Sequence, residues 1–342
     1  MPANDIVISA FDLLSALGIG REESAAAWAE GGSACFPPTR ATMPEGAEPL
    51  AGEVPDFTLV DILPTPKAYL DRQSELLLAA TALARRAGRI DPSPFPPERT
   101  GLAIGSAWGA LQTLGLFFDD YVKKGPRLVK PILFPHSYAN AAISLAAMEW
   151  EIRGPHLNFV SGAAASTQAL IAALDTLRNG EADLVLAGGA EGLSLPRWRA
   201  RLAAGCDAPP GEGAAVLLIE RGETARARGL APLAHLLGGA TASGAPQAIR
   251  ETVSRAITAA LEDAGLRPQA IKRCLANRLA ADALGDAAWP VRTLDDLLGD
   301  TEGAGGALMA ACALLEPEAL PALILTAGAD GTASAVVLRQ AD

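Results

Sequence analysis

The chain has 342 residues, of which 50% are hydrophobic and 20% charged, and its formal net charge at pH 7 is −11. This length and composition predict a globular protein with room for two ordinary hydrophobic cores. A strongly acidic chain binds phosphate backbones poorly, so we expect no nucleic-acid partner. Two small basic clusters, at 123–130 and 197–201, are interpreted as solvated surface, with contact to an acidic partner as the alternative.

Strand-like and helix-like segments alternate along the chain, which predicts an α/β fold. A first strand at 6–10 is followed by a long polar, proline-rich connection over 36–67. Asn179-Gly180 ends the helix predicted at 164–178 with a pair suited to left-handed backbone geometry. The other predicted strands are 101–106, 157–161, 183–189, 213–220, 231–237, 274–276, 323–327 and 333–338, and the other predicted helices are 72–87, 141–152, 246–264 and 305–315.

The cysteines and the N-terminus predict a cytoplasmic protein without a metal or a cofactor. Cys35, Cys206, Cys274 and Cys312 have neither metal-ligand nor C-x-x-C spacing, so we expect free thiols. The N-terminus lacks the basic segment and apolar run of a signal peptide. The longest apolar run, 304–315, is too short to span a bilayer. No G-x-G-x-x-G turn joins a strand to a helix, so dinucleotide binding is not expected.

The segment 154–168 carries the most specific pattern in the chain. Gly154-Pro155 precedes a short apolar strand, and small residues from Ser161 to Ala165 then lead into a helix. This pattern resembles the nucleophile motif of β-ketoacyl synthases, in which a Cys lies at the start of that helix. A helix N-terminus stabilises a thiolate through its free N–H groups and the positive end of its dipole. Ala163 stands at the Cys position, and a methyl group cannot carry an acyl chain.

The resemblance continues over most of the chain, although the family's two catalytic histidines are missing. Arg278 falls at the position of the first histidine and Asp300 at the position of the second. Those histidines stabilise the negative charge that develops on the thioester oxygen during decarboxylation, whereas an Asp would repel it. The segments that match the family in order are Ser15–Gly20, Asp71-Arg72, Gly105-Ser106, Phe134-Pro135, Gly180–Asp183, Ala187–Glu191, Gly211–Ala214 and Ala225–Gly229.

The family resemblance implies a thiolase-like fold with two topologically similar βαβ halves in a layered αβαβα arrangement. We place an N-terminal half with the degenerate nucleophile turn at 1–225 and a shortened C-terminal half at 226–342. A retained scaffold with an erased active site is similar to the chain length factors of type II polyketide synthases. Ala163 and the short chain resemble most the factors of aryl polyene or other polyene pathways.

A factor of this kind has no catalytic residues and is expected to have no independent activity. The resemblance implies a heterodimer with an active ketosynthase, in which the factor shapes the acyl tunnel and an acyl carrier protein docks mainly on the partner. Two alternatives remain open. One is an acyltransferase or decarboxylase of altered chemistry that uses Ser161, Ser166, Arg278 or Asp300. The other is a homodimeric, non-catalytic scaffold.

Two segments are expected to meet the partner. The resemblance places the far end of the partner's tunnel on Trp108, Leu111, Leu114, Phe117 and Phe118. If this segment is helical, Leu111, Leu114 and Phe118 share one apolar face, which ordinary core packing would also explain. The resemblance also implies a dimer interface on one strand, which pairs antiparallel across a two-fold axis and consists of Leu157, Asn158, Phe159, Val160 and Ser161.

Overall fold

The computed structural model describes residues 5–44, 50–206, 208–285 and 287–341. Their strands follow the order β4-β3-β5-β6-β1-β7-β11-β10-β8-β9, with β2 beside β1. The strands are β1 (Ile6–Ser15), β2 (Gly18–Ile19), β3 (Thr100–Ser106), β4 (His156–Val160), β5 (Leu184–Glu191), β6 (Gly213–Arg221), β7 (Ala234–Ser243), β8 (Arg273–Ala276), β9 (Val291–Thr293), β10 (Ala322–Ala327) and β11 (Thr332–Gln340).

The helices connect these strands and cover them. The α-helices are α1 (Arg21–Glu30), α2 (Leu59–Ile62), α3 (Arg72–Ala87), α4 (Leu111–Lys124), α5 (Ala141–Glu149), α6 (Ala165–Arg178), α7 (Leu195–Ala203), α8 (Gly222–Ala227), α9 (Ile249–Ala264), α10 (Arg278–Leu284), α11 (Asp295–Leu298) and α12 (Gly305–Leu315). Three short 3₁₀ helices bear on the site, namely η2 (Pro131–His136), η3 (Gly162–Ala164) and η6 (Glu302–Ala304).

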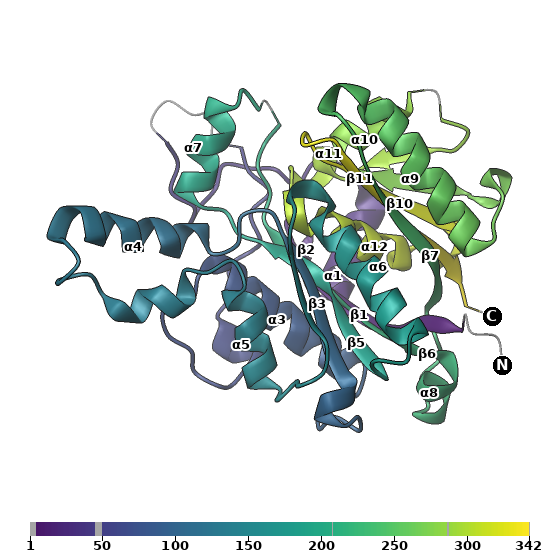
Figure 1. Cartoon of the computed structure of the whole chain (residues 1–342), viewed down its shortest axis with the longest axis horizontal. Coiled ribbons are helices and arrows are strands. Elements are labelled where there is room, and N and C mark those ends of the chain that lie inside the picture. The colour runs from purple at the N-terminus through teal and green to yellow at the C-terminus, as the bar shows by residue number, and fades with distance from the viewer. Residues whose placement is uncertain (1–4, 45–49, 207, 286, 342) are drawn as a thin grey trace.

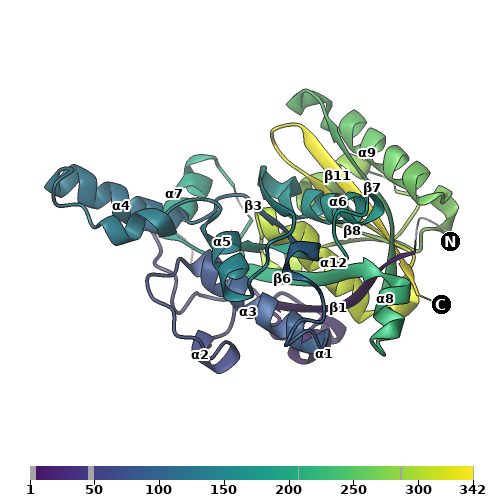
Figure 2. The ribbon, with the colours of Figure 1, turned by 60° about the horizontal axis from the view of Figure 1, so that its bottom comes forward.

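The elements form five layers, which confirms the predicted thiolase-like αβαβα fold (Figures 1 and 2). The strands divide into an N-terminal and a C-terminal set that are joined where β1 pairs with β7, through Val7–His235 and Ile8–Ala234. Helices α6 and α12 lie between the two sets, since α6 packs against β3 and β5 on one side and β7 and β11 on the other. Helices α3 and α5 pack on the outer face of the first set, and α9 packs on that of the second.

The central layer explains why the sequence of α12 is apolar on every side. All residues from Gly305 to Leu314 are buried, because the helix is enclosed by both strand sets and by α6. A helix that is hydrophobic all round is stable only in such an environment. The outer helix α3 is instead amphipathic, and it begins where the Asp71 carboxylate accepts a hydrogen bond from the Gln73 amide.

Most of the predicted helices and strands are present in the structure. The differences are in where some elements begin and end, and in several helices that were not predicted. Helices α3 and α12 have the predicted bounds, whereas β1 runs on to Ser15 and β4 ends at Val160 instead of Ser161. Helices α1, α7 and α10 were not predicted. The connection at 36–67 contains α2, and its residues 45–49 lie outside the described part. Helix α8 lies at the proposed boundary between the halves, which remains a prediction.

Within the described residues, no helix is both long enough and apolar enough to cross a membrane. The same residues contain no group of three His, Cys, Asp or Glu side chains arranged to hold a metal ion.

Candidate functional site

The turn between β4 and α6 presents Ala163 at the N-terminal end of the central helix. Gly162 has a φ of 63°, in the left-handed region that glycine adopts without strain, and this lets the strand turn directly into η3 and α6. Gly105 on β3 allows α6 to approach closely, because a Cβ atom there would lie 2.2 Å from the Ser166 nitrogen. The methyl group of Ala163 is half-buried and lines a cavity.

This cavity, of about 780 Å³, brings together Ala163, Arg278 and Asp300, the three residues that we expect at the positions of the family's catalytic residues. Ala163 comes from the end of β4, Arg278 from the start of α10 and Asp300 from the turn after α11. The lining therefore joins both halves of the chain. The other lining residues are Ala107, Trp108, Val160, Ser161, Gly162, Arg201, Cys206, Ala208, Asn277, Leu279, Asp282, Asp295, Glu302, Ala327, Gly328, Ala329 and Asp330.

Asp300 is bound by an arginine of α7. The Arg201 Nη1 atom lies 2.6 Å from Oδ2 of Asp300 and 2.5 Å from Oε1 of Glu302. Both carboxylates raise the pKa of Arg201 although its burial alone would lower it, so the guanidinium stays charged. A second arginine of α7, Arg197, reaches Glu302 Oε2 at 3.1 Å and the Asp300 carbonyl at 2.8 Å.

The interpretation of the basic cluster at 197–201 as solvated surface is wrong for two of its three arginines. The side chains of Arg197 and Arg201 are 1% and 5% exposed, whereas Arg199 is exposed. Arg197 and Arg201 are four residues apart, and this spacing places them on one face of a helix. Sequence reasoning could have found them from that spacing, had α7 been predicted after the Ser194 cap and Pro196.

Glu302 has a strained backbone that its side-chain partners hold in place. Its φ is 42°, in the left-handed region that non-glycine residues rarely adopt. Its amide donates to Asp300 Oδ1 at 3.0 Å, and the indole N–H of Trp108 donates to its carboxylate. Together with Arg197 and Arg201, these contacts fix the turn at the position where the family has its second histidine.

Two further carboxyls at the site have raised pKa values. Burial and the nearby negative charge of Asp300 raise the pKa of Asp295 to about 7, and its Oδ2 accepts a hydrogen bond from the Arg278 amide at 2.8 Å. Burial raises the pKa of Glu191 to about 7 as well, although the amides of Ala107 and Trp108 donate to its carboxylate at 2.6 and 3.3 Å. Glu191 lies in a segment that matches the family, but its sequence gave no indication of this environment.

The two serines beside Ala163 are held by other contacts. Ser166 is fully buried, and its Oγ accepts a hydrogen bond from the Ala307 amide at 3.0 Å. The Ser161 hydroxyl donates to Gln168 Oε1 at 2.5 Å. Among the described residues that line the cavity, none is a His or a Lys, so no imidazole or amine is placed there to activate Ser161. The thiol on the lining belongs to Cys206, which is exposed.

Helix α4 and the following chain as far as η2, residues 111–136, form an arm that projects from the body of the molecule (Figure 1). Leu111, Leu114 and Phe117 are half-buried and Phe118 is 53% exposed, so none belongs to a buried core in the isolated chain. Phe117 packs on Phe134 of η2 with ring centroids 5.6 Å apart. Trp108 lies apart from this face, on the cavity wall.

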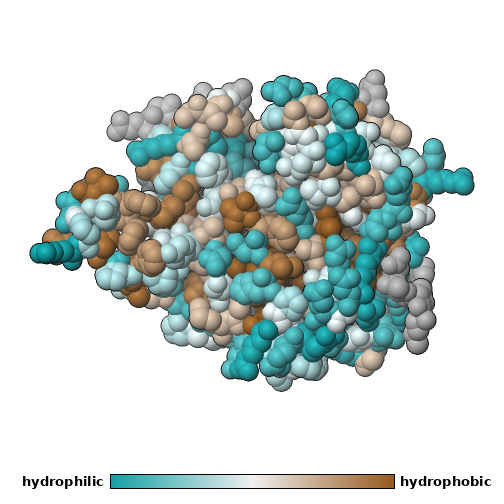
Figure 3. Space-filling view, viewed as in Figure 1, coloured by the Kyte–Doolittle hydropathy of each residue, from teal (hydrophilic) through white to brown (hydrophobic). Residues whose placement is uncertain are grey.

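Apolar side chains gather on the surface of this arm, as Figure 3 shows at its left. Exposed apolar side chains gathered on one projecting segment are uncommon in monomers and are typical of surfaces that bind a partner. The exposed large apolar residues on the arm are Leu116, Phe118, Tyr121, Val122, Leu128, Ile132 and Phe134.

Among the described residues, strand β4 is the edge of the sheet, and one side of its backbone has no neighbouring strand. It pairs in parallel with β3, with Phe159 opposite Gly105. Leu157 and Phe159 pack toward the central core, whereas Val160 is 48% exposed. An uncovered edge strand is a template for pairing with another chain. Ser161, which we expected in this strand, belongs instead to the turn and lines the cavity.

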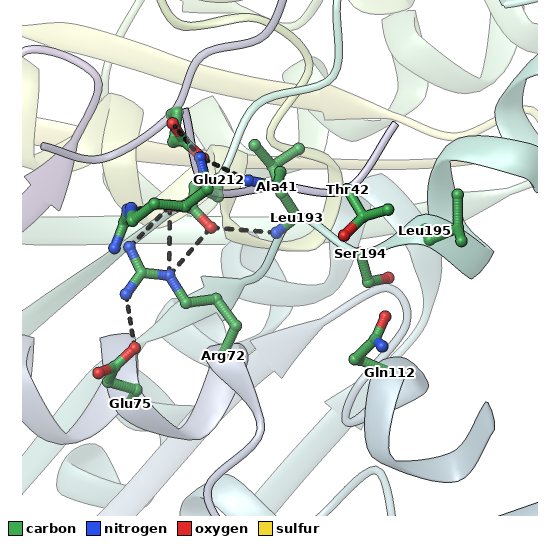
Figure 4. Close-up of a pocket in the computed structure, with 11 residues that line it drawn as sticks. Ala41, Thr42, Arg72, Glu75, Gln112, Leu193, Ser194, Leu195 and Glu212 are labelled. Carbon is green, nitrogen blue, oxygen red and sulfur yellow. Dashed lines mark hydrogen bonds and ion pairs between the residues drawn. The ribbon is translucent and has the colours of Figure 1, made fainter. Parts of the chain in front are cut away.

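A second, smaller cavity of about 300 Å³ has five charged residues on its wall, and ion pairs link four of them, Arg40, Arg72, Glu75 and Glu212 (Figure 4). At its centre, Glu212 is 2% exposed and accepts hydrogen bonds from Arg72 at 2.8 Å, from Arg40 at 3.3 Å and from the amides of Val54 and Leu193. Arg72 also binds Glu75 at 2.5 Å. With its charges satisfied internally, this cluster holds loops together, and we assign it no chemistry.

Comparisons with known proteins agree with this geometry. A family model described as the N-terminal domain of β-ketoacyl synthase matches residues 3–206. The 3-oxoacyl-[acyl-carrier-protein] synthase 2 of Staphylococcus aureus is 27% identical over 249 residues, which are 65% of this chain and 62% of that protein. The matched part thus spans less than two thirds of that curated relative.

Solved structures of low sequence identity share the fold over nearly the whole chain. A β-ketoacyl synthase from Burkholderia phymatum has a TM-score of 0.88 at 22% identity, covering 99% of this chain and 100% of that one. The ishigamide ketosynthase/chain length factor has a TM-score of 0.84 at 24% identity, with 99% and 100% coverage. At such identities the likeness concerns the fold.

Proposed function

Because this chain belongs to the β-ketoacyl synthase family, we propose that it is the non-catalytic, chain-length-factor-like partner of an active ketosynthase. The observation that carries the proposal is the cavity at the start of α6. It keeps the family's placement of the reactive turn, yet the turn presents a methyl group at Ala163. Arg278 and Asp300, which occupy the histidine positions, are both engaged in ion pairs.

A partner is supported by two surfaces of the chain. The free edge of β4 and the apolar arm at 111–136 both leave groups exposed that a second subunit of the same fold would cover. The ishigamide ketosynthase/chain length factor shares the fold of this chain. We propose that the arm contributes Leu111, Leu114, Phe117 and Phe118 to the far end of the partner's acyl tunnel, and that an acyl carrier protein docks mainly on that partner.

The polyene character of the product is part of the same proposal and rests on Ala163 and the length of the chain. The alternative of an acyltransferase or decarboxylase receives no support from the serines, because Ser166 is buried and the Ser161 hydroxyl donates to the amide oxygen of Gln168. A homodimeric scaffold would use the same two surfaces, so only an experiment with the partner separates it from the heterodimer.

The decisive experiment is co-expression of this chain with an intact ketosynthase from the same organism. We expect a 1:1 complex that elongates acyl-carrier thioesters, while this chain alone elongates none. A ketosynthase that makes the same products at the same rate with and without this chain would overturn the proposal. A stable homodimer that ignores the ketosynthase would favour the scaffold.

A further inference from the structure

The wall of the large cavity carries more carboxylates than cations. Two arginines line it, Arg201 and Arg278. Five carboxyls line it as well, and they come from α10, α11, the turn that follows α11 and the loop before β11: Asp282, Asp295, Asp300, Glu302 and Asp330.

Neither lining guanidinium is free to receive an anion. Arg201 binds Asp300 and Glu302 at once and is 5% exposed. Arg278 forms its ion pair with Asp296, a carboxylate that is not on the lining and that offsets its charge. Arg197 lies behind the wall and binds Glu302. Within the described residues, the potential inside the cavity is therefore set by the excess of carboxylates.

The rest of the lining is suited to an uncharged group. Ala107, Trp108, Val160, Ala163 and Leu279 contribute apolar surface, and the volume of about 780 Å³ is within the range of small-molecule sites. We infer that this cavity admits uncharged acyl groups and rejects ligands that carry a carboxylate, and that Asp295 and Asp300 determine this selectivity. The inference goes beyond the proposed pairing with a ketosynthase, since it concerns the cavity of this chain alone.

Asp295 and Asp300 are expected to repel an anion because their carboxylates are held at the cavity wall with little water around them. Asp295 is 8% exposed and Asp300 is half-buried, so the water that would screen their charges is largely excluded. Asp295 projects from α11 and Asp300 from the next turn, and the like charges are close enough that Asp300 raises the pKa of Asp295. Above pH 7, where Asp295 is ionised in the folded protein, a carboxylate entering the cavity would meet the same repulsion, and each lining guanidinium already has a carboxylate partner.

The native chain contains a reporter for this property. Cys206 lines the cavity and is exposed, whereas Cys274 and Cys312 are buried. Iodoacetamide and iodoacetate are similar in size, but only iodoacetate is an anion. The alkylation of Cys206 by each reagent is measured at about pH 8, where Asp295 is ionised, by peptide mass spectrometry. We expect the ratio of the iodoacetamide rate to the iodoacetate rate to be at least about tenfold higher in the folded protein than in the same protein unfolded in urea.

The variants Asp295→Asn and Asp300→Asn should each lower this ratio, and the double variant should return it most of the way to the unfolded value. Asp56→Asn is the matched control, because it removes the same charge from a side chain that is 86% exposed and does not line the cavity. Added salt should also lower the ratio in the native protein.

A native ratio equal to the unfolded one would overturn the inference, and this holds even if a variant fails to fold. So would a folded double variant with an unchanged ratio. Neither result bears on co-purification with a ketosynthase, so the failure of this inference and the failure of the proposed function are distinguishable.

Discussion

The guanidinium of Arg201 binds Asp300 at 2.6 Å, so the turn after α11 is tied to helix α7 by a residue 99 positions earlier in the chain. Arg201 is 5% exposed, and it binds Glu302 at the same time. A buried charge pair contributes little compared with apolar packing, but removal of one partner leaves the other charge buried and unpaired.

The first prediction follows from that pair. Arg201→Met should destabilise the protein by about 3–5 kcal/mol, because Asp300 and Glu302 would lose their shared cation. Urea unfolding followed by circular dichroism measures this change. Arg199→Met is the matched control, since Arg199 is exposed on the same helix and should change stability by about 0.5 kcal/mol at most. Equal losses in both variants would contradict the prediction.

The second prediction concerns pH. The folded-state pKa of Asp295 is raised to about 7 from an ordinary value of 3.8, so between these pH values the folded protein keeps a proton that the unfolded chain has lost. Stability from this group is therefore lost as the pH rises from about 4 to 7, by at most about 1.4 kcal/mol per pH unit.

Asp295→Asn removes this dependence. The free energy of unfolding of Asp295→Asn minus that of the native protein should rise between pH 5 and pH 8, measured by urea unfolding at each pH. Glu191 has a raised pKa in the same direction, but it is present in both proteins and cancels in the difference. A difference that stays constant over this range would contradict the assignment.

The third prediction concerns the free edge of β4. The Leu102 amide donates to the Pro155 carbonyl at 2.8 Å, and Leu102 lies opposite His156. Because bonds in a parallel ladder involve alternate residues, the Phe159 amide points toward β3 and the Asn158 amide toward the free edge. Asn158→Pro should therefore abolish co-purification with the ketosynthase, since it removes a donor from the strand that pairs across the dimer.

Asn158→Ala is the control for this change, because it keeps the amide and should keep the complex. Phe159→Pro should also abolish the complex, but by breaking the ladder to β3, so it should lower the melting temperature of the isolated chain more than Asn158→Pro does. A complex that survives Asn158→Pro would mean that the arm alone holds the subunits together.

The fourth prediction concerns the arm. Truncating Phe118 to Ala should yield polyketides longer than those of the native complex, because a smaller side chain at the tunnel end leaves room for more carbons. Since Phe118 is 53% exposed, the change should cost less stability than the roughly 3–5 kcal/mol of a buried Phe. Mass spectrometry of the products and the melting temperature of the complex provide the two readouts.

Val122→Ala is the control on the same helix, with a side chain that is 79% exposed, and should leave chain length unchanged. Leu114→Ala should act in the same direction as Phe118→Ala. Unchanged products from a stably folded Phe118→Ala complex would remove this residue from the tunnel, and an effect of Phe117→Ala instead would shift the assignment by one residue.

The fifth prediction is the absence of a covalent intermediate on this chain. After incubation with acyl-carrier thioesters, intact-mass measurement should show no adduct, because Ala163 has no nucleophile and the Ser166 hydroxyl is buried. The partner ketosynthase, treated in parallel, is the positive control. A stoichiometric adduct mapped to Ser161 or Ser166 would restore the reading as an acyltransferase.

Local signals along the sequence predicted an α/β fold, whereas the layered αβαβα arrangement was implied by the family resemblance. The all-apolar run of α12 and the capped, amphipathic pattern of α3 each determine an element without reference to the rest of the chain. The meeting of Ala163, Arg278 and Asp300 in one cavity depends on the crossing of the two halves, and only the family resemblance anticipated it.

The ion pairs at the site could not be predicted in this way. Arg201 and Asp300 are 99 residues apart, and the sequence shows only that one is basic and the other acidic. Whether such residues face solvent or each other depends on where α7 packs in the fold. Local periodicity gives no information about that placement. The same holds for the burial of Glu191, since its raised pKa comes from the strands and turns around it.

The Glu212 carboxylate has a consequence for the order in which the chain assembles. Its donors come from the loop with Arg40 and Val54, from the first turn of α3 and from the turn at Leu193, segments separated by up to 172 residues. The buried carboxylate is fully stabilised only when all of these donors are in place, and ordering each segment costs conformational entropy. A chain with one of these segments undocked would leave the carboxylate to water or short of donors, so the docking of each segment favours the docking of the others.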